Sequence, residues 1–149
     1  DPNYRASLWS DPETAQLRMQ SLIPYVDMMK ISDEETSLLT PYQDPEEAIQ
    51  YLLRQGVHLV AVTLGRDGAL IGNENGIVKA EGFSSHAVDT TGAGDSFWGG
   101  FLSCYLGLEK EITELTGEDD SVWQGRQRSG KPVRRTPRRN LGNSGDGGD

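Results

Sequence analysis

The sequence has few of the residues on which several common functions depend. It contains one cysteine, Cys104, so no disulfide can form within the chain, and its place in an apolar stretch indicates core packing rather than a reactive thiol. The two histidines, His58 and His86, have no partner at metal-ligand spacing, which argues against a role in metal binding. No apolar run approaches the roughly 18 residues that a membrane span needs, and no charged-then-apolar leader opens the chain. We therefore expect a cytoplasmic protein without a membrane partner.

Basic residues are also in short supply. Lys and Arg number 14 against 23 Asp and Glu, which gives a formal net charge of -9 at pH 7. This acidic balance disfavours nucleic acid as a partner of the whole chain. The charge is uneven, because residues 117–149 hold seven basic residues and five acids, about +2, which leaves residues 1–116 at about -11. A phosphate ligand would have to be held by local geometry and not by bulk charge.

Residues 1–116 alternate between helical and strand patterns, as a doubly wound α/β sheet requires. The run at 58–64 is nearly all apolar, which is typical of a parallel strand covered on both faces. The first helix is expected to start at a Ser-x-x-Glu box formed by Ser10 and Glu13 and to end near Pro24. The other expected elements are a strand at 26–31, a brief helix through Leu39, a helix from Asp44 that stops at Gly56, a hairpin of strands 69–72 and 76–80, and a helix at 93–106.

A glycine-rich turn leads directly into the last of these helices. Gly92, Ala93 and Gly94 carry almost no side chain, so their backbone N–H groups can approach a phosphate closely at the positive end of the helix dipole. Asp95 follows in the first helical turn, where its carboxylate can accept the proton of a hydroxyl that attacks phosphorus. The pattern indicates phosphoryl transfer to an alcohol. The alternative is a glycine-rich helix entry whose Asp only caps the free amides.

The full run D-T-T-G-A-G-D at 89–95, together with D-P-N-Y-R at 1–5 and Leu8-Trp9, resembles the PfkB family of ribokinase-like carbohydrate kinases, in particular its fructokinase branch. Residues 1–116 resemble the C-terminal part of such a kinase. The resemblance implies a partial ribokinase-like three-layer α/β fold and transfer of a phosphoryl group from ATP to a sugar, with fructose favoured and 2-keto-3-deoxygluconate or another sugar left open. It implies Asp95 as the base and Gly92, Ala93 and Gly94 as the anion hole. It also implies ATP and Mg²⁺ as cofactors, leaves K⁺ as a further ion, and leaves a homodimer open for the intact enzyme.

The resemblance implies two groups of ligand-binding residues away from the glycine-rich turn. Thr63, Gly65 and Gly68 match positions that contact the nucleotide, although T-x-G-x-x-G also describes an ordinary strand exit. Asn3 and Arg5 lie at a strand exit that would face the reacting phosphate, where the guanidinium of Arg5 could offset phosphate charge or contact the sugar.

Three residues are candidates for metal binding. Glu35 matches a family position that helps to place magnesium and phosphate, usually through water, but Ser32 stands where the family usually has Asn. Ser32 and Glu35 also form a capping box, which needs no ligand, and both interpretations can hold together. Asp89 and Thr91 match positions that hold a monovalent cation; the alternative is that they tie down a turn.

Hydrophobic periodicity stops near Thr116, and we expect residues 117–149 to form a disordered basic, Gly- and Arg-rich tail. Codons allowed for residues 123–146, read one nucleotide later, can encode strings that resemble the closing helix of the same kinase family. This leads to the hypothesis that a frame change near residues 116–122 produced the tail. It also supports an alternative function, a catalytically inert or partner-binding remnant of a sugar kinase.

Overall fold

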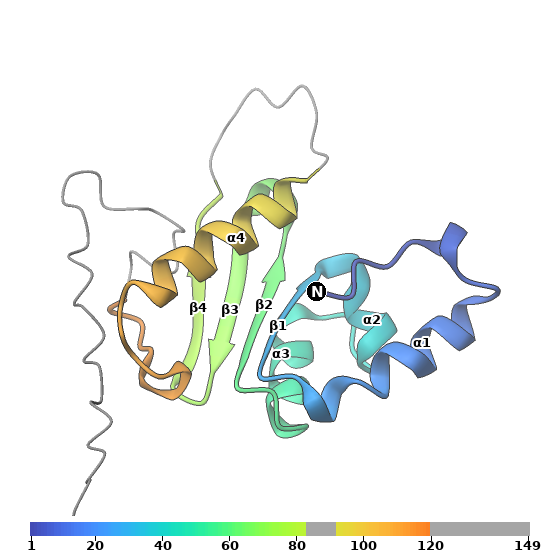
Figure 1. The fold of residues 1–149 in the computed structure, drawn as a ribbon, viewed down its shortest axis with the longest axis horizontal. Coiled ribbons are helices and arrows are strands. Elements are labelled where there is room, and N and C mark those ends of the chain that lie inside the picture. The colour runs from blue at the N-terminus through green and yellow to red at the C-terminus, as the bar shows by residue number, and fades with distance from the viewer. Residues whose placement is uncertain (83–91, 120–149) are drawn as a thin grey trace, which may run out of the picture.

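The structure is a computed structural model and describes residues 1–82 and 92–119. Its centre is a sheet with the strand order β1-β2-β3-β4 (Figure 1). β1 and β2 are parallel, whereas β3 runs antiparallel to both β2 and β4. The strands are β1 (Met28–Ser32), β2 (Leu59–Thr63), β3 (Ala69–Asn73) and β4 (Gly76–Ala80).

Helices cover both faces of the sheet, so the described part has three layers (Figure 1). α3 packs against β2 and β3 on one face, and α4 crosses the other face. The helices are α1 (Pro12–Gln20), α2 (Thr36–Leu39), α3 (Pro45–Arg54) and α4 (Ala93–Leu106), and short 3-10 turns lie at Ala6–Leu8, Ile23–Tyr25, Asp33–Glu35, Gly65–Asp67 and Ile112–Glu114. Within residues 1–82 and 92–119, no helix is long and apolar enough to span a bilayer.

The core is divided by the sheet into two clusters, and β2 contributes to both. Val60 and Val62 face α3, whereas Leu59 and Ala61 face the side of α4. A strand buried on both faces was the expectation from its continuous apolar run, and this is confirmed. Phe101 of α4 is fully buried in the second cluster.

Cys104 packs against this second cluster, as predicted for a residue that fills the core. Its partial burial raises the pKa of the thiol. The charged form is therefore disfavoured, which agrees with a packing role.

The first helix differs from its prediction. α1 is capped by Asp11, whose side chain accepts a hydrogen bond from the Thr14 N–H, and not by Ser10. Pro12 has no N–H and suits the first helical position, so the cap falls on the residue directly before it. The helix also ends at Gln20, and Pro24 belongs to a separate 3-10 turn.

The β3–β4 hairpin holds the chain that follows α4. The Asn73 amide donates hydrogen bonds to the carbonyl oxygens of Ile112 and Leu115, at 3.1 and 2.8 Å. The Asn75 amide donates to the carbonyl oxygens of Thr113 and Leu115, at 2.7 and 2.8 Å. Leu115 is fully buried. The two asparagines therefore bind residues 112–115, which follow α4, to the β3–β4 hairpin.

Candidate functional site

The carboxyl ends of the two parallel strands lie side by side. Ser32, the last residue of β1, is in register with Thr63, the last residue of β2. The Thr63 hydroxyl donates a hydrogen bond of 3.4 Å to the carbonyl oxygen of Ile31. In open α/β sheets, ligands bind at this edge. The structure thus places Thr63, a predicted nucleotide contact, at the edge where a ligand is expected.

Glu35 joins this edge to the start of the chain. One carboxylate oxygen accepts a 2.7 Å hydrogen bond from the Tyr4 N–H, and the other accepts from the N–H and the hydroxyl of Ser32, at 2.9 and 3.2 Å. The capping box predicted for Ser32 and Glu35 is confirmed. The contact with Tyr4 had no signal in the sequence, because it joins residues 31 positions apart.

The hydrogen bond of Tyr4 to Glu35 also brings its two chain neighbours, Asn3 and Arg5, to this region; both are predicted ligand-binding residues. Asn3 has a φ of 47°, and both Asn3 and Arg5 are exposed. A positive φ is uncommon for a residue other than glycine and is most often seen with Asn and Asp. The backbone therefore turns sharply beside Glu35 and leaves both side chains open to solvent.

The glycine-rich turn begins α4 as predicted. Gly92 has the left-handed conformation, with a φ of 78°, and its carbonyl oxygen accepts the first helical hydrogen bond from the Ser96 N–H at 2.9 Å. Gly92 has no side chain that could cap the helix, and nothing lies within 4 Å of the place where its Cβ would be. Asp95 is exposed, and its carboxylate accepts no hydrogen bond from residues 1–82 or 92–119. In this part of the chain, Asp95 therefore does not act as the cap.

Lys30 is the main residue that the prediction missed. Alternation along β1 turns Lys30 toward the face of α4, where its side chain is 9% exposed and its ammonium lies 3.1 Å from an Asp1 carboxylate oxygen. The same ammonium reaches the first turn of α4, because a Cβ built on Gly94 would lie 2.9 Å from Lys30 Nζ. The available signal was a single charge inside an apolar strand, since lysine is almost never fully buried without a partner.

The two glycines after β2 have different surroundings. Gly65 has a φ of 59° with nothing within 4 Å of its Cβ position, so it leaves open space at the strand exit. Gly68 has a φ of 94°, and a Cβ there would overlap the carbonyl oxygen of Ala80 and lie 2.6 Å from the Gly82 nitrogen. Close packing of two backbone segments is thus a sufficient reason for glycine at position 68.

The predicted metal residues are only partly described. Asp89 and Thr91 lie outside the described residues. Across 1–82 and 92–119, no group of three or more Cys, His, Asp or Glu side chains could hold a metal ion. Glu35 alone could act there, and the oxygen bonded to Tyr4 accepts one hydrogen bond, which leaves it able to accept another from water.

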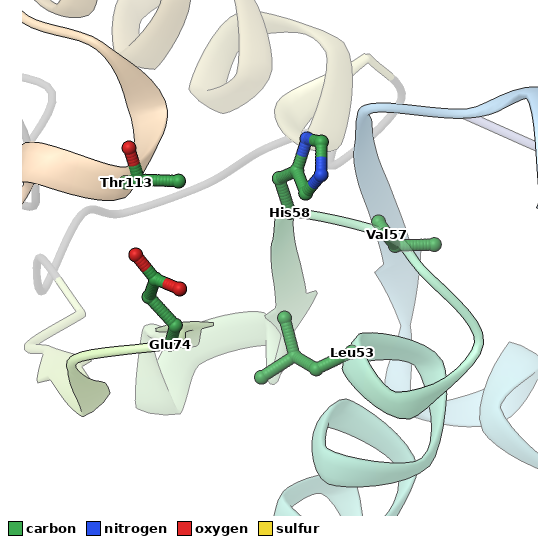
Figure 2. A pocket seen from close by; sticks show the side chains of 5 residues that line it. All are labelled: Leu53, Val57, His58, Glu74 and Thr113. Atoms are coloured by element: carbon green, nitrogen blue, oxygen red, sulfur yellow. The ribbon is translucent and has the colours of Figure 1, made fainter.

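A cavity of about 120 Å³ lies at the opposite end of β2 (Figure 2). Its lining residues are Leu53, Val57, His58, Glu74 and Thr113. His58 immediately precedes β2, so this cavity is separated from the Ser32–Thr63 edge by the length of the strand. The Nδ1 atom of His58 lies 3.8 Å from an Asp27 carboxylate oxygen.

Comparisons with known proteins identify the class to which this fold and edge belong. An engineered double mutant of the fructokinase from Vibrio cholerae O395, whose structure holds fructose, ADP and a potassium ion, superposes with a TM-score of 0.71 and 35% identity, over 84% of this chain and 40% of that one. The described α/β arrangement is therefore the ribokinase-like fold.

Residues 1–116 match the pfkB family carbohydrate kinase, and the chain belongs to this family. It is 37% identical over 113 residues to an ATP-dependent 6-phosphofructokinase of Thermoanaerobacterium thermosaccharolyticum, covering 76% of this chain and 34% of the relative. It is 38% identical over 104 residues to the probable fructokinase-2 of Arabidopsis thaliana, covering 69% and 32%. The chain thus spans about a third of the length of these curated relatives.

Proposed function

We propose that this chain forms the phosphate-binding part of an ATP-dependent sugar kinase, and that the acceptor is fructose. The observation that carries the proposal is the contact between Lys30 on β1 and Gly94 at the start of α4, because it brings a helix N-terminus close to the ligand-binding edge of the sheet, and Gly92, the residue that begins this helix, supplies no side-chain cap. Membership of a carbohydrate kinase family supports the reaction class. A fructose-bound neighbour supports the choice of sugar, and 2-keto-3-deoxygluconate remains the alternative acceptor.

In the proposed reaction, a sugar hydroxyl oxygen attacks the terminal phosphorus of Mg–ATP, and the bond between that phosphorus and the ADP oxygen breaks. The proton of the hydroxyl passes to the Asp95 carboxylate, which is exposed and not engaged by residues 1–82 or 92–119. The N–H groups of Gly92, Ala93 and Gly94 bind the equatorial phosphate oxygens. Thr63, Gly65 and Gly68 are proposed to contact the nucleotide, with Gly65 beside the open space.

The remaining proposed contacts surround the phosphates. Magnesium, which enters with ATP, neutralises phosphate charge. Glu35 is proposed to position it through water, which agrees with the free accepting capacity of one carboxylate oxygen. Asn3 and Arg5 are proposed to face the phosphate or the sugar, and Asp89 and Thr91 to hold K⁺.

A second proposal concerns the 149 residues taken alone. Because they span about a third of the relatives, we propose that this stretch without the rest of a kinase is a catalytically inert remnant that still binds nucleotide. Catalysis requires several groups to be held within well under an ångström, so a part of a site retains little activity. We also propose a boundary between the kinase part at 1–116 and a tail at 117–149.

The test is calorimetric titration of the chain with ATP in the presence and absence of magnesium, combined with an assay of ADP release with fructose. We expect magnesium-dependent binding and negligible ADP release. In Asp95→Asn, binding should persist, and any fructose-dependent ADP release by the parent chain should disappear, because the base is lost while the anion-binding amides remain. Absence of ATP binding under both conditions would refute the kinase assignment for this chain.

A further inference from the structure

Lys30 has an unusual position for a lysine. Its side chain is 9% exposed, on a strand whose neighbouring residues Met29 and Ile31 belong to the apolar core. Burying an ammonium is costly unless it is paired and hydrogen-bonded. Its one ion pair within the described ranges is with Asp1, which leaves donor capacity on a group that has three N–H bonds.

The second unusual feature is that the Lys30 ammonium faces the N-terminus of a helix. Its Nζ and Cε would lie 2.9 and 3.3 Å from a Cβ on Gly94, in the first turn of the 14-residue helix α4. The N-terminus of a helix carries a partial positive charge, so a cation is favoured at the other end. A buried cation and a positive helix end at one place repel each other unless an anion lies between them.

We propose that Lys30 is a further phosphate-binding residue of this site, and that its ammonium donates a hydrogen bond to a phosphate oxygen held at the start of α4. The inference rests on the proposed kinase function. In the absence of phosphate, the Asp1 carboxylate partly neutralises the ammonium and holds it in place. A bound phosphate then competes with Asp1 for the same cation, so the Lys30–Asp1 pair sets how strongly the site binds anions.

The test uses inorganic tripolyphosphate as the probe, because it carries the phosphates of ATP without the adenosine. Lys30→Met should weaken binding to the full chain on the order of tenfold or more, which corresponds to the loss of a charge-assisted hydrogen bond. Lys79→Met is the matched control, since it removes the same charge from a side chain that is 52% exposed on β4; its affinity should stay unchanged. Asp1→Asn should tighten binding by about two- to fivefold, because the competing carboxylate is gone.

A spectroscopic measurement on the parent chain covers the case in which Lys30→Met does not fold. The chain has four lysines, and the missing Hε–Cε signal in Lys30→Arg identifies that of Lys30. Tripolyphosphate should shift this signal and leave that of Lys79 in place. Equal affinity in a folded Lys30→Met, or an unmoved Lys30 signal in a chain that binds tripolyphosphate, overturns the inference alone. If the parent chain and Lys79→Met bind neither tripolyphosphate nor Mg–ATP, the kinase proposal fails with it.

Discussion

Both oxygens of the Glu35 carboxylate accept hydrogen bonds, and the donors come from two separate stretches of the chain. Ser32 supplies the local donors at the end of β1, and the Tyr4 N–H supplies a distant one. A single side chain therefore caps a 3-10 turn and also fixes the segment that carries Asn3 and Arg5. Such a residue combines a structural role with the arrangement of the proposed ligand contacts.

Glu35→Gln keeps the shape of the side chain but replaces one accepting oxygen with a donor group, which cannot serve both Tyr4 and Ser32. We expect the free energy of unfolding to fall by about 1–3 kcal/mol, because a partly buried N–H loses its partner. Urea denaturation measures the change. Glu34→Gln is the control, since Glu34 is exposed, and it should unfold within about 0.5 kcal/mol of the parent chain. Equal unfolding of the two variants would contradict the role given to Glu35.

At the scale of the element, the glycines of α4 differ in what their surroundings and backbone conformation require. Gly92 needs a positive φ to start the helix, and Gly94 lies against Lys30. Gly99, in contrast, sits within the helix with nothing within 4 Å of its Cβ position. Glycine is therefore favoured by the backbone conformation at position 92 and by close packing at position 94, and by neither at position 99.

Gly99→Ala should stabilise the protein by about 0.5–1 kcal/mol, because alanine loses less backbone entropy in a helix interior than glycine. Gly92→Ala should instead destabilise it by about 1–2 kcal/mol, since the left-handed conformation is unfavourable for a residue with a Cβ. Thermal unfolding monitored by circular dichroism compares the two variants. Changes of the same sign would show that φ at position 92 does not govern the start of α4.

The stability contributed by Asp11, the N-cap of α1, should depend on pH. Hydrogen bonds from the Thr14 N–H, and then from the Ser10 and Thr14 hydroxyls, hold the pKa of Asp11 below its ordinary value of 3.8. A lowered folded-state pKa means that the carboxylate stabilises the fold above the unfolded pKa, and that this contribution is lost as the pH falls through the folded value. Asp11→Asn should therefore lose less stability than the parent chain between about pH 4 and pH 2. Urea midpoints over this range provide the measurement, and parallel curves would contradict it.

Elements with strong local signals were predicted well from the sequence. Helix 93–106 and the start of α3 after Asp44 agree with the structure, because a glycine-rich entry and an Asp-Pro cap are local features. The contact between Lys30 and Gly94 could not be predicted in this way. Strand alternation reveals that Lys30 faces a buried side, but it does not say which element, 64 positions further along, covers that side.

On the scale of the whole molecule, the described part ends in a segment that is firmly attached. Asn73 and Asn75 hold the carbonyl oxygen of Leu115, and Lys110 pairs with Asp119 at 2.7 Å. Hydrogen bonds from the Lys110 ammonium and the Thr116 N–H lower the pKa of the Asp119 carboxyl. The charged form of Asp119 therefore stabilises the attachment of this segment. The family match ends at residue 116, within the same segment.

Deleting residues 120–149 should therefore leave the urea midpoint of the chain unchanged. Deletion from residue 112 onward should lower it strongly, because it removes the fully buried Leu115 and leaves the buried amide of Asn73 without its two acceptors. Urea denaturation of the two shortened chains, with the full chain as reference, checks both expectations. A marked loss of stability in the first deletion would show that the last 30 residues contribute to the fold.

The attachment of Leu115 also sets an order of events during synthesis on the ribosome. The buried residues of the cluster beneath α3 all lie between residues 23 and 62, so most of this cluster can pack once β2 has emerged, before β3 completes it. The opposite face of the sheet, with Leu59 and Ile71, has to wait for α4 and then for Leu115. Until that residue leaves the exit tunnel, the nascent chain presents a half-covered sheet. In this interval a chaperone or a neighbouring chain could compete for the apolar face.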